Sequence, residues 1–310
     1  MPIHDIIGDV HGQFAKLVAL LDALGYRLVD GAYRHPDPER TAIFVGDLID
    51  RGPGQVETVE LVHAMVEAGS ARMVMGNHEF NALGWATPMD DGSGAWARPH
   101  NEAKRSQHEA YLAQVVEGSP LHHEHLDWFR TLPLWIDEPG LPRVVHACWN
   151  EPAMTSIREV LGDQPMSAEF IREASRTGSN LYEAVEVVLK GPEVDLPSGV
   201  EFRLENEDRT RARIAWWNLE EPILSKIALI PHGQDAGTLP DTELPHAVDY
   251  RYESDQPVYF GHYWMRGAPG PVADGMICVD YSAGKDGSLV ACTVDSATPG
   301  TWEFTEIPHA

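Results

Sequence analysis

The chain has 310 residues, of which 43% are hydrophobic and 23% charged, so it can bury a sizeable core and carries too little charge for wholesale disorder. Its 48 Asp and Glu residues outnumber 23 Lys and Arg residues, and the resulting net charge of −25 disfavours binding to a nucleic-acid polymer. The sequence has no apolar run of the roughly 18 residues that a membrane helix needs, no signal-like start and only three cysteines, so we expect a cytoplasmic protein that does not bind membranes.

Strand and helix patterns alternate through the first quarter of the chain. Short apolar runs predict buried strands over 3–7, 41–47 and 71–77, and apolar residues at helical spacing predict helices over 17–24 and 56–66. This alternation implies a parallel sheet with right-handed crossovers. Ligands of such sheets gather beyond the carboxyl ends of the strands.

The middle of the chain is less regular. Residues 85–101 are rich in Gly, Pro and Asp and predict a loop, whereas residues 102–131 predict helix. Residues 142–149 form another apolar run that is typical of a buried strand. Residues 150–255 show helical stretches followed by a charged region with frequent prolines.

The last part of the chain predicts strands over 256–264, 275–282 and 287–295. The last two strands flank the turn signal AGKDG, so we expect them to form a β-hairpin in which Cys278 lies opposite Cys292. In a reducing compartment both cysteines are expected to be reduced core residues.

Potential metal ligands follow five of these strands. They are Asp9 and His11 in GDVHG, Asp47 in GDLIDRGP, Asn77 and His78 in GNHE, His146 in VVHAC and His262 in YFGHYW. A single Asp-x-His at a strand end is more often a turn or a cap, but five such sites are hard to explain in that way. The set mixes imidazole with carboxylate and amide oxygens, which suits Mn²⁺, Fe or Zn²⁺. A carboxylate shared between two ions would hold them about 3.5–4 Å apart, as in two-metal hydrolases.

These motifs, in this order, resemble those of the calcineurin-like metallophosphoesterases. The DRG form resembles the phosphoprotein phosphatase branch, which includes bacterial relatives that cleave diadenosine tetraphosphate symmetrically. The resemblance covers residues 3–82, 142–149 and 256–295. It implies an α/β fold, a β-sandwich of two mixed sheets flanked by helices, with 1–310 as a single domain. Because residues 150–255 lie between two strands that carry potential metal ligands, we expect them to form an inserted cap that determines specificity.

The resemblance also implies a pair of divalent metal ions, with Mn²⁺ expected and Fe or Zn²⁺ as alternatives. The first ion would be bound by Asp9 and His11, and Asp47 would bridge both ions. The second ion would be bound by Asn77, His146 and His262. A plainer interpretation of His146 and His262 is that each is a hydrogen-bonded core histidine.

Three further residues have roles that the resemblance implies. Arg51 would hold the phosphate oxygens, His78 would protonate the leaving group and Asp50 would orient His78. The side-chain chemistry agrees, since a guanidinium matches two phosphate oxygens and an imidazole can carry a proton near neutral pH. Arg51 could instead form an ion pair with Asp50.

Basic residues outside these motifs are candidates for substrate binding. Arg98 belongs to a local basic segment, and Arg211 and Arg213 alternate on one face of an expected strand in DRTRARIAWW. They could bind a second phosphate or stack on a base. A solvated strand face is the plainer interpretation.

These observations predict an enzyme whose partner is a phosphorylated protein, nucleotide or small molecule. We expect a phosphomonoesterase that works by in-line attack of a hydroxide held between two metal ions. The alternative is symmetrical hydrolysis of dinucleoside tetraphosphates. A non-catalytic binding scaffold is disfavoured because every expected ligand and the acid histidine are present.

Overall fold

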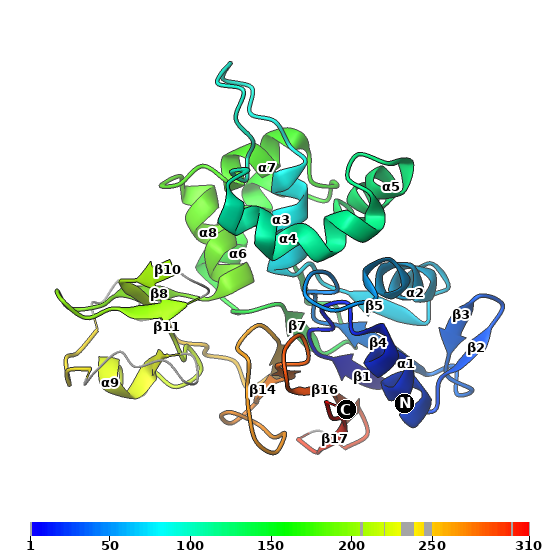
Figure 1. Cartoon of the computed structure of the whole chain (residues 1–310). Coiled ribbons are helices and arrows are strands. Elements are labelled where there is room, and N and C mark those ends of the chain that lie inside the picture. The colour runs from blue at the N-terminus through cyan, green and yellow to red at the C-terminus, as the bar shows by residue number, and fades with distance from the viewer. Residues whose placement is uncertain are drawn as a thin grey trace.

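Two mixed β-sheets form the centre of the molecule (Figure 1). The computed structural model describes residues 2–204, 207–219, 221–230, 239–244, 250–298 and 300–309. The six-stranded sheet contains β1 (Ile3–Ile7), β4 (Arg40–Phe44), β5 (Ala71–Met73), β15 (Asp280–Tyr281), β16 (Ser288–Asp295) and β17 (Trp302–Ile307). The four-stranded sheet contains β6 (Trp135–Ile136), β7 (Arg143–Val145), β13 (Val258–Phe260) and β14 (Met276–Cys278).

The pairing of the strands confirms the expected sheet type. Strands β1, β4 and β5 are parallel neighbours, and β16 runs antiparallel to β1. In the second sheet β13 lies parallel to both β7 and β14, and β6 is antiparallel to β7. The carboxyl ends of β1, β4 and β5 therefore meet at one edge, as the sequence predicted.

The two sheets pack face to face through a buried apolar layer. Ile6 of β1, Tyr259 of β13 and Ile277 of β14 belong to one cluster that joins the two sheets. Their neighbours Ile7 and Phe44 point to the opposite face and join the larger cluster, which contains the helices. Burial on both faces explains why the last residues of β1 and β4 are apolar without alternation.

The described residues include helices that lie outside the two central sheets. They are α1 (Phe14–Ala23), α2 (Gln55–Glu67), α3 (Asn77–Trp85), α4 (Glu102–Val115), α5 (Pro120–Phe129), α6 (Glu151–Leu161), α7 (Ala168–Ala174), α8 (Asn180–Lys190) and α9 (Leu224–Ile227). Figure 1 shows α1 and α2 beside the six-stranded sheet and α3 to α8 gathered above the strands. In the part of the chain that the structure describes, no helix has the length and apolar character of a membrane span.

The helical segment expected over 102–131 consists of two helices. Asn101 caps α4 by accepting a hydrogen bond from the Lys104 amide, and Val116 ends this helix with φ 60°. Ser119 caps α5 in the same way, with Pro120 at its first turn. Local capping chemistry therefore divides the segment.

Short strands complete the fold. A small hairpin, β2 (Arg27–Val29) and β3 (Ala32–Arg34), separates α1 from β4. In the expected cap region β8 (Glu193–Asp195), β11 (Arg211–Ile214) and β12 (Ala228–Leu229) form one sheet, and β9 (Phe202–Leu204) pairs with β10 (Glu207–Arg209).

The range expected to form a cap, 150–255, has two kinds of packing. Helices α6 to α8 contribute buried residues such as Ile157 and Val185 to the main core. The strands after α8 have an apolar cluster of their own, which includes Val194 and Ile214. Parts of the expected cap, 205–206, 220, 231–238 and 245–249, lie outside the described residues.

The hairpin predicted at the C-terminal end is wrong in part. β15 and β16 do pair antiparallel across the AGKDG turn. Cys278, however, lies in β14 opposite Phe260 of β13, and Cys292 lies opposite Ile6. The chain leaves one sheet after Cys278 and enters the other at Asp280, a change of partner that a local turn signal does not reveal. Cys278, Cys292 and Cys148 are buried and free, as expected for reduced core residues.

Candidate metal centre and substrate cleft

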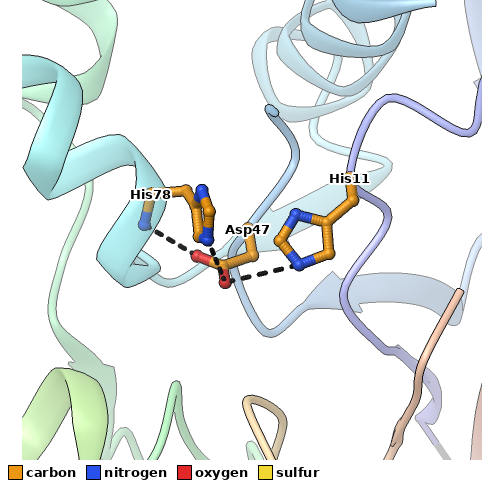
Figure 2. Close-up of side chains that lie close together, drawn as sticks. All are labelled: His11, Asp47 and His78. Carbon is orange, nitrogen blue, oxygen red and sulfur yellow. Dashed lines mark hydrogen bonds and ion pairs between the residues drawn. The ribbon is translucent and has the colours of Figure 1, made fainter. Parts of the chain in front are cut away.

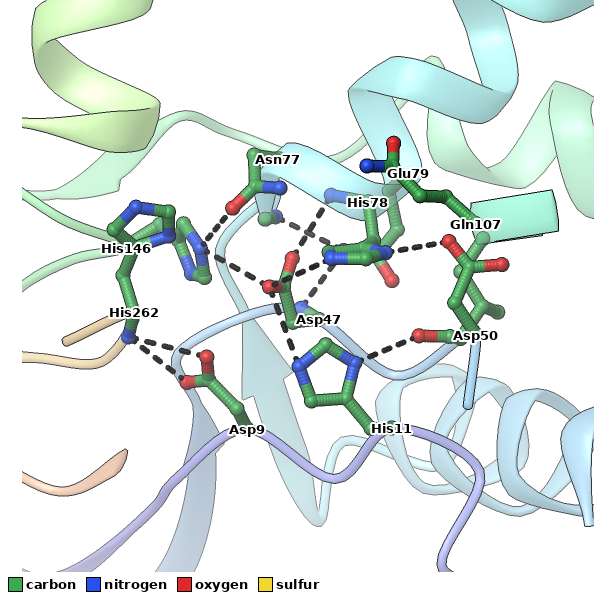
Figure 3. A network of polar contacts seen from close by, with 12 residues as sticks. Asp9, His11, Asp47, Asp50, Asn77, His78, Glu79, Gln107, His146 and His262 are labelled. Atoms are coloured by element: carbon green, nitrogen blue, oxygen red, sulfur yellow. Dashed lines mark hydrogen bonds and ion pairs between the residues drawn. The ribbon is translucent and has the colours of Figure 1, made fainter. Parts of the chain in front are cut away.

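The six expected metal ligands lie around one centre at the edge of the two sheets (Figure 3). The six-stranded sheet positions Asp9 after β1, Asp47 after β4 and Asn77 after β5. The four-stranded sheet positions His146 after β7 and His262 after β13. His11 follows Asp9 in the first turn. The side chains thus come from five strand ends and both sheets.

Asp47 is the common member of this cluster. One ligand atom from each of His11, Asp47 and His78 lies within 4.8 Å of the others, and the same holds for Asp47, His146 and His262. Figure 2 shows His11 and His78 approaching the carboxylate of Asp47, with both Nε2 atoms 3.8 Å from its Oδ2. A carboxylate placed between two groups of ligands is the arrangement expected for two neighbouring ions.

Backbone carbonyls orient two of the imidazole rings. The Nδ1 atoms of His11 and His146 lie 2.9 Å from the Ile49 carbonyl and 2.7 Å from the Val45 carbonyl. An Nδ1–H that donates to a carbonyl leaves Nε2 with its lone pair, which is the metal-binding form of the ring. The Nε2 atom of His146 then lies 3.0 Å from the amide oxygen of Asn77 and 3.4 Å from Asp47 Oδ2.

His262 gives the clearest indication that the cluster suits a cation. Its Nε2 atom is buried and has no hydrogen-bond partner among the described residues. A buried imidazole nitrogen without a partner is unfavourable unless it binds something. Its backbone N–H donates to Asp9 Oδ2 at 3.1 Å, which fixes that carboxylate beside the ring. The donor set of carboxylate, imidazole and amide oxygen therefore fits a divalent metal.

The charge states of the cluster are consistent with this fit. Burial lowers the pKa of His11 to about 3, with further lowering by Arg51, so the ring is neutral at physiological pH. Burial likewise lowers the pKa of His262. For Asp9, burial followed by repulsion from Asp280 raises the pKa well above its usual value. Neutral imidazoles can ligate a metal, and crowded carboxylates gain from a nearby cation.

The pKa of Asp47 moves in the opposite direction. Burial opposes ionisation of this carboxyl, but His146 and His78 together lower its pKa well below the ordinary value. The position shared by the two groups of candidate ligands therefore holds a carboxylate rather than a neutral acid.

His78 and Asp50 form a hydrogen-bonded pair beside the cluster. The Nδ1 atom of His78 lies 2.5 Å from Asp50 Oδ2, which orients the imidazole. Burial would lower the pKa of His78, but Asp47 and Asp50 raise it, so the ring gains proton affinity. Asp50 also interacts with a second histidine, His108 of α4, whose Nδ1 lies 2.8 Å from Oδ1. No motif in the sequence pointed to His108 as a partner of Asp50.

Glu79 holds the turn that carries Asp47. Its carboxylate accepts hydrogen bonds from the amides of Asp47 and Leu48 at 2.8 Å and from the Gly76 amide at 3.0 Å. Glu79 therefore supports this turn through backbone amides. Gly76 is needed for close approach, since a Cβ there would lie 2.2 Å from Asp47 Oδ1.

Backbone strain is concentrated at the same place. His11, Asp47, Asp50, Arg51 and His262 all have positive φ values, between 49° and 76°. This region is unfavourable for residues other than glycine, and strain of this kind clusters at functional sites.

A large cleft opens at the metal cluster. Its volume is about 1270 Å³, and Asp47, Asn77, His78 and His262 form part of its lining. Eight basic side chains also line it, namely Arg51, Arg98, Lys104, Lys190, Arg209, Arg211, Arg213 and Lys285. Five acidic side chains share the lining, namely Asp47, Glu109, Glu183, Glu186 and Glu193. In a chain with a net charge of −25, this local excess of cations is suited to an anionic ligand.

The structure places Arg98, Arg211 and Arg213 in this one cleft, although they come from distant segments. Arg98 donates to Gln107 at 2.9 Å. Arg211 and Arg213 project from the same face of β11, and both form ion pairs with Glu193. The expected alternation along this strand is therefore confirmed.

Sequence reasoning missed Asp280 and Trp264. Asp280 accepts hydrogen bonds from the amides of Trp264 at 2.7 Å and Ser282 at 2.9 Å, so it supports the loop after His262. Its position after the apolar run ICV matches the pattern of the other strand-end carboxylates and was the available signal. Trp264 had no comparable signal, because a tryptophan after a strand is usually a core residue.

Known proteins share both sequence and fold with this chain. A segment of 127 residues is 53% identical to the asymmetrical bis(5'-nucleosyl)-tetraphosphatase PrpE of Halalkalibacterium halodurans, covering 38% of this chain and 51% of that protein. A segment of 160 residues is 34% identical to the symmetrical bis(5'-nucleosyl)-tetraphosphatase of Aromatoleum aromaticum, covering 50% of this chain and 49% of that protein. The chain thus matches about half the length of these two relatives.

Solved structures show a similar fold at low sequence identity. The crystal structure of a candidate diadenosine tetraphosphatase has a TM-score of 0.50 and 18% identity, covering 100% of this chain and 96% of that one. A protein serine/threonine phosphatase from Saccharomyces cerevisiae has the same TM-score with 14% identity, covering 100% and 80%.

The calcineurin-like phosphoesterase family matches residues 5–196, which is more than half of the chain. This match confirms the resemblance in the strand-end motifs, the sandwich of mixed sheets and, at the level of the family, the expected class of metal-dependent phosphoesterase. The chain belongs to the calcineurin-like phosphoesterase family.

Proposed function

We propose that this protein is a divalent-metal-dependent phosphoesterase that hydrolyses dinucleoside tetraphosphates. The observation that carries the proposal is the cleft, which extends from the metal cluster along a wall of basic side chains. Its volume of about 1270 Å³ exceeds the range of about 300–1,000 Å³ typical of small-molecule sites. The similarity to proteins named as tetraphosphatases supports the same substrate class.

In this proposal the six gathered side chains would hold two divalent ions, with Mn²⁺ as the expected metal and Fe or Zn²⁺ as alternatives. Asp9 and His11 would hold the first ion, and Asn77, His146 and His262 would hold the second. Asp47 would serve both ions, since it alone belongs to both groups of candidate ligands found among the described residues. Bound ions would supply Lewis acidity, which activates water and offsets the charge on the phosphoryl oxygens.

The remaining roles follow from the side chains around the cluster. Arg51 lies in the cleft lining beside Asp47 and can hold two phosphoryl oxygens through its planar guanidinium. His78 protonates the departing oxygen, because its pKa is raised and its ring faces the cleft. Asp50 keeps the proton on the correct ring nitrogen by accepting from Nδ1.

Residues 1–310 form a single domain in this proposal, and 150–255 act as a cap over the cleft. Within that range, the strands after α8 are the part that we expect to determine substrate specificity, because they pack around an apolar cluster of their own. Arg211 and Arg213 line the cleft from β11, and Arg98 lines it from the loop between α3 and α4. All three would bind the polyphosphate chain.

The sequence alone favoured a phosphate monoester, from a phosphoprotein or a small compound, as the substrate. Such a substrate would use Arg51 and the metal cluster, whereas Arg209, Arg211 and Arg213, which pair with Glu193, line a part of the cleft that a single phosphate does not need. We therefore place monoester hydrolysis second.

Product analysis tests the proposal. The Mn²⁺-loaded protein is incubated in parallel with diadenosine tetraphosphate and with a phosphoserine peptide, and the products are separated by chromatography. Two molecules of ADP would indicate symmetrical cleavage, and ATP with AMP would indicate asymmetrical cleavage. Release of phosphate from the peptide at a higher kcat/KM than either dinucleotide reaction would contradict the proposal.

A further inference from the structure

Three cations from distant parts of the chain surround one indole ring. The Arg51 guanidinium lies 5.9 Å from the centroid of the Trp264 ring, and the Arg213 guanidinium lies 5.8 Å from it. The Lys285 ammonium lies 4.6 Å from the same centroid. These residues belong to the turn after β4, to β11 and to the turn between β15 and β16. An aromatic face attracts cations, so Trp264 offsets part of the repulsion among them.

The position of this ring is fixed by the backbone. The Trp264 amide donates to Asp280 Oδ2 at 2.7 Å, and the residue has a positive φ of 50°. Such a conformation is unfavourable for a bulky residue and persists only where the surroundings impose it. The backbone that carries the indole is therefore held beside the three cations.

The group lies directly beside the metal cluster. Trp264 follows the candidate ligand His262 by two residues, and Arg51 is close enough to His11 to lower its pKa. The turn that carries Lys285 packs on the same histidine, since a Cβ at Gly284 would lie 2.6 Å from His11 Cδ2. Trp264, Arg51, Arg213 and Lys285 all line the cleft.

Cations gathered in a cleft attract an anion. Glu193 lies 3.9 Å from Arg213 and is shared with Arg209 and Arg211. Arg51, Arg213 and Lys285 thus surround Trp264 in the cleft, next to the place where the reacting phosphate would sit.

We propose that Arg213 and Lys285, which lie with Arg51 around Trp264, form a second phosphate position that binds the phosphate adjoining the scissile one, whereas Arg51 holds the scissile phosphate itself. The ligand class is a chain of linked phosphates, and the position makes such chains better ligands than a single phosphate. The inference deepens the proposed function and rests on it for the natural ligand. Binding of linked phosphates can nevertheless be measured without any turnover.

The experiment uses two phosphonates that the enzyme cannot hydrolyse. Methylphosphonate presents one phosphonate group, whereas methylenediphosphonate presents two joined by carbon. Their dissociation constants are measured by calorimetry on the full chain loaded with Mn²⁺. The variants are Lys285→Gln, Arg213→Gln and Trp264→Leu, and the control is Arg266→Gln. Arg266 is an exposed cation that pairs with Asp286 near the same turn but does not line the cleft.

We expect each variant to raise the dissociation constant of methylenediphosphonate by about tenfold or more, as for loss of a charge-assisted contact. The dissociation constant of methylphosphonate should rise clearly less. Arg266→Gln should leave both affinities within about twofold of the parent protein. The inference would be overturned if the variants raised the two dissociation constants equally, which would leave their ratio unchanged. Lys285 is exposed, so its variant should fold even if Trp264→Leu does not.

The outcome is separable from that of the proposed function. If diadenosine tetraphosphate is not cleaved but the variants lose preference for the diphosphonate, the substrate assignment is wrong and the second phosphate position stands. If the dinucleotide is cleaved but the preference survives in every variant, the second phosphate position is wrong and the proposed function stands.

Discussion

Asp47 and His78 lie side by side, yet their surroundings give them different tasks. The Asp47 carboxylate belongs to both groups of candidate ligands, whereas His78 has its Nδ1 bonded to Asp50. We predict that Asp47→Asn lowers bound metal, because the shared anionic ligand is lost. We predict that His78→Asn lowers kcat by about 10²-fold or more, as for loss of a general acid, and largely preserves metal content.

Metal analysis of the purified variants, together with kcat on one substrate, checks this division of roles. A His78→Asn protein with an empty site would show that His78 is a ligand, which its distance of 3.8 Å from Asp47 Oδ2 makes a real alternative.

His108 offers a second prediction for a single residue. Its Nδ1 atom lies 2.8 Å from Asp50 Oδ1, the carboxylate oxygen that does not contact His78. Its Nε2 atom is buried without a hydrogen-bond partner in the described residues. We expect His108→Leu to loosen Asp50 and so misplace His78. The effect should depend on how strongly the leaving group needs a proton, with kcat falling about tenfold or more for an alkyl phosphate and less for p-nitrophenyl phosphate.

His125→Phe is the matched control. It alters another buried histidine, which contacts Tyr111 but not Asp50. If kcat of the His108→Leu variant fell equally for the alkyl phosphate and for p-nitrophenyl phosphate, His108 would only support the fold.

At the scale of elements, α5 should make stability depend on pH. Burial lowers the pKa of both His122 and His125 to about 4. The unfolded chain, with pKa near 6.5, then binds more protons than the folded one between pH 6.5 and 4. Stability from these neutral rings is present above pH 6.5 and is lost progressively as the pH falls to about 4.

Thermal unfolding of metal-free protein between pH 7 and pH 4.5 tests this expectation. His125→Phe removes one of the two titrating rings, so its midpoint should fall less over this range than that of the parent protein. His123→Gln, an exposed change on the same helix, should follow the parent curve. If the thermal midpoint of His125→Phe fell with pH as steeply as that of the parent protein, protonation of His125 would not be a cause of the pH dependence.

The elements that carry the site were predictable because their signals are local. Strands β1 and β4 finish in buried apolar residues and are followed within a few residues by Asp9 and Asp47, so pattern and chemistry coincide in a short stretch of sequence. The change of sheet between Cys278 and Asp280 was not predictable, because a strand partner depends on residues far along the chain. The contact between His108 and Asp50 was missed for the same reason.

At the scale of the whole molecule, the metal cluster joins two sheets. Asp9, Asp47 and Asn77 follow strands of the six-stranded sheet, and His146 and His262 follow strands of the four-stranded sheet. A ligand that binds only the folded state adds stability in proportion to RT ln(1 + [L]/Kd), about 2.7 kcal/mol at a hundredfold excess over Kd. Metal should therefore stabilise the sandwich as a whole and not only the loops that bind it.

We predict that saturating Mn²⁺ raises the thermal midpoint by about 5 °C relative to chelator-treated protein. Asp47→Asn should remove most of this increase, because both groups of ligands lose their common member. Arg98→Gln, which changes the cleft lining but no candidate ligand, should retain it. Scanning calorimetry of the parent protein and the two variants, with and without Mn²⁺, measures this increase in the thermal midpoint. A full metal-induced increase in Asp47→Asn would mean that the stabilising ion binds elsewhere, and the two sheets would then owe their packing to the apolar layer alone.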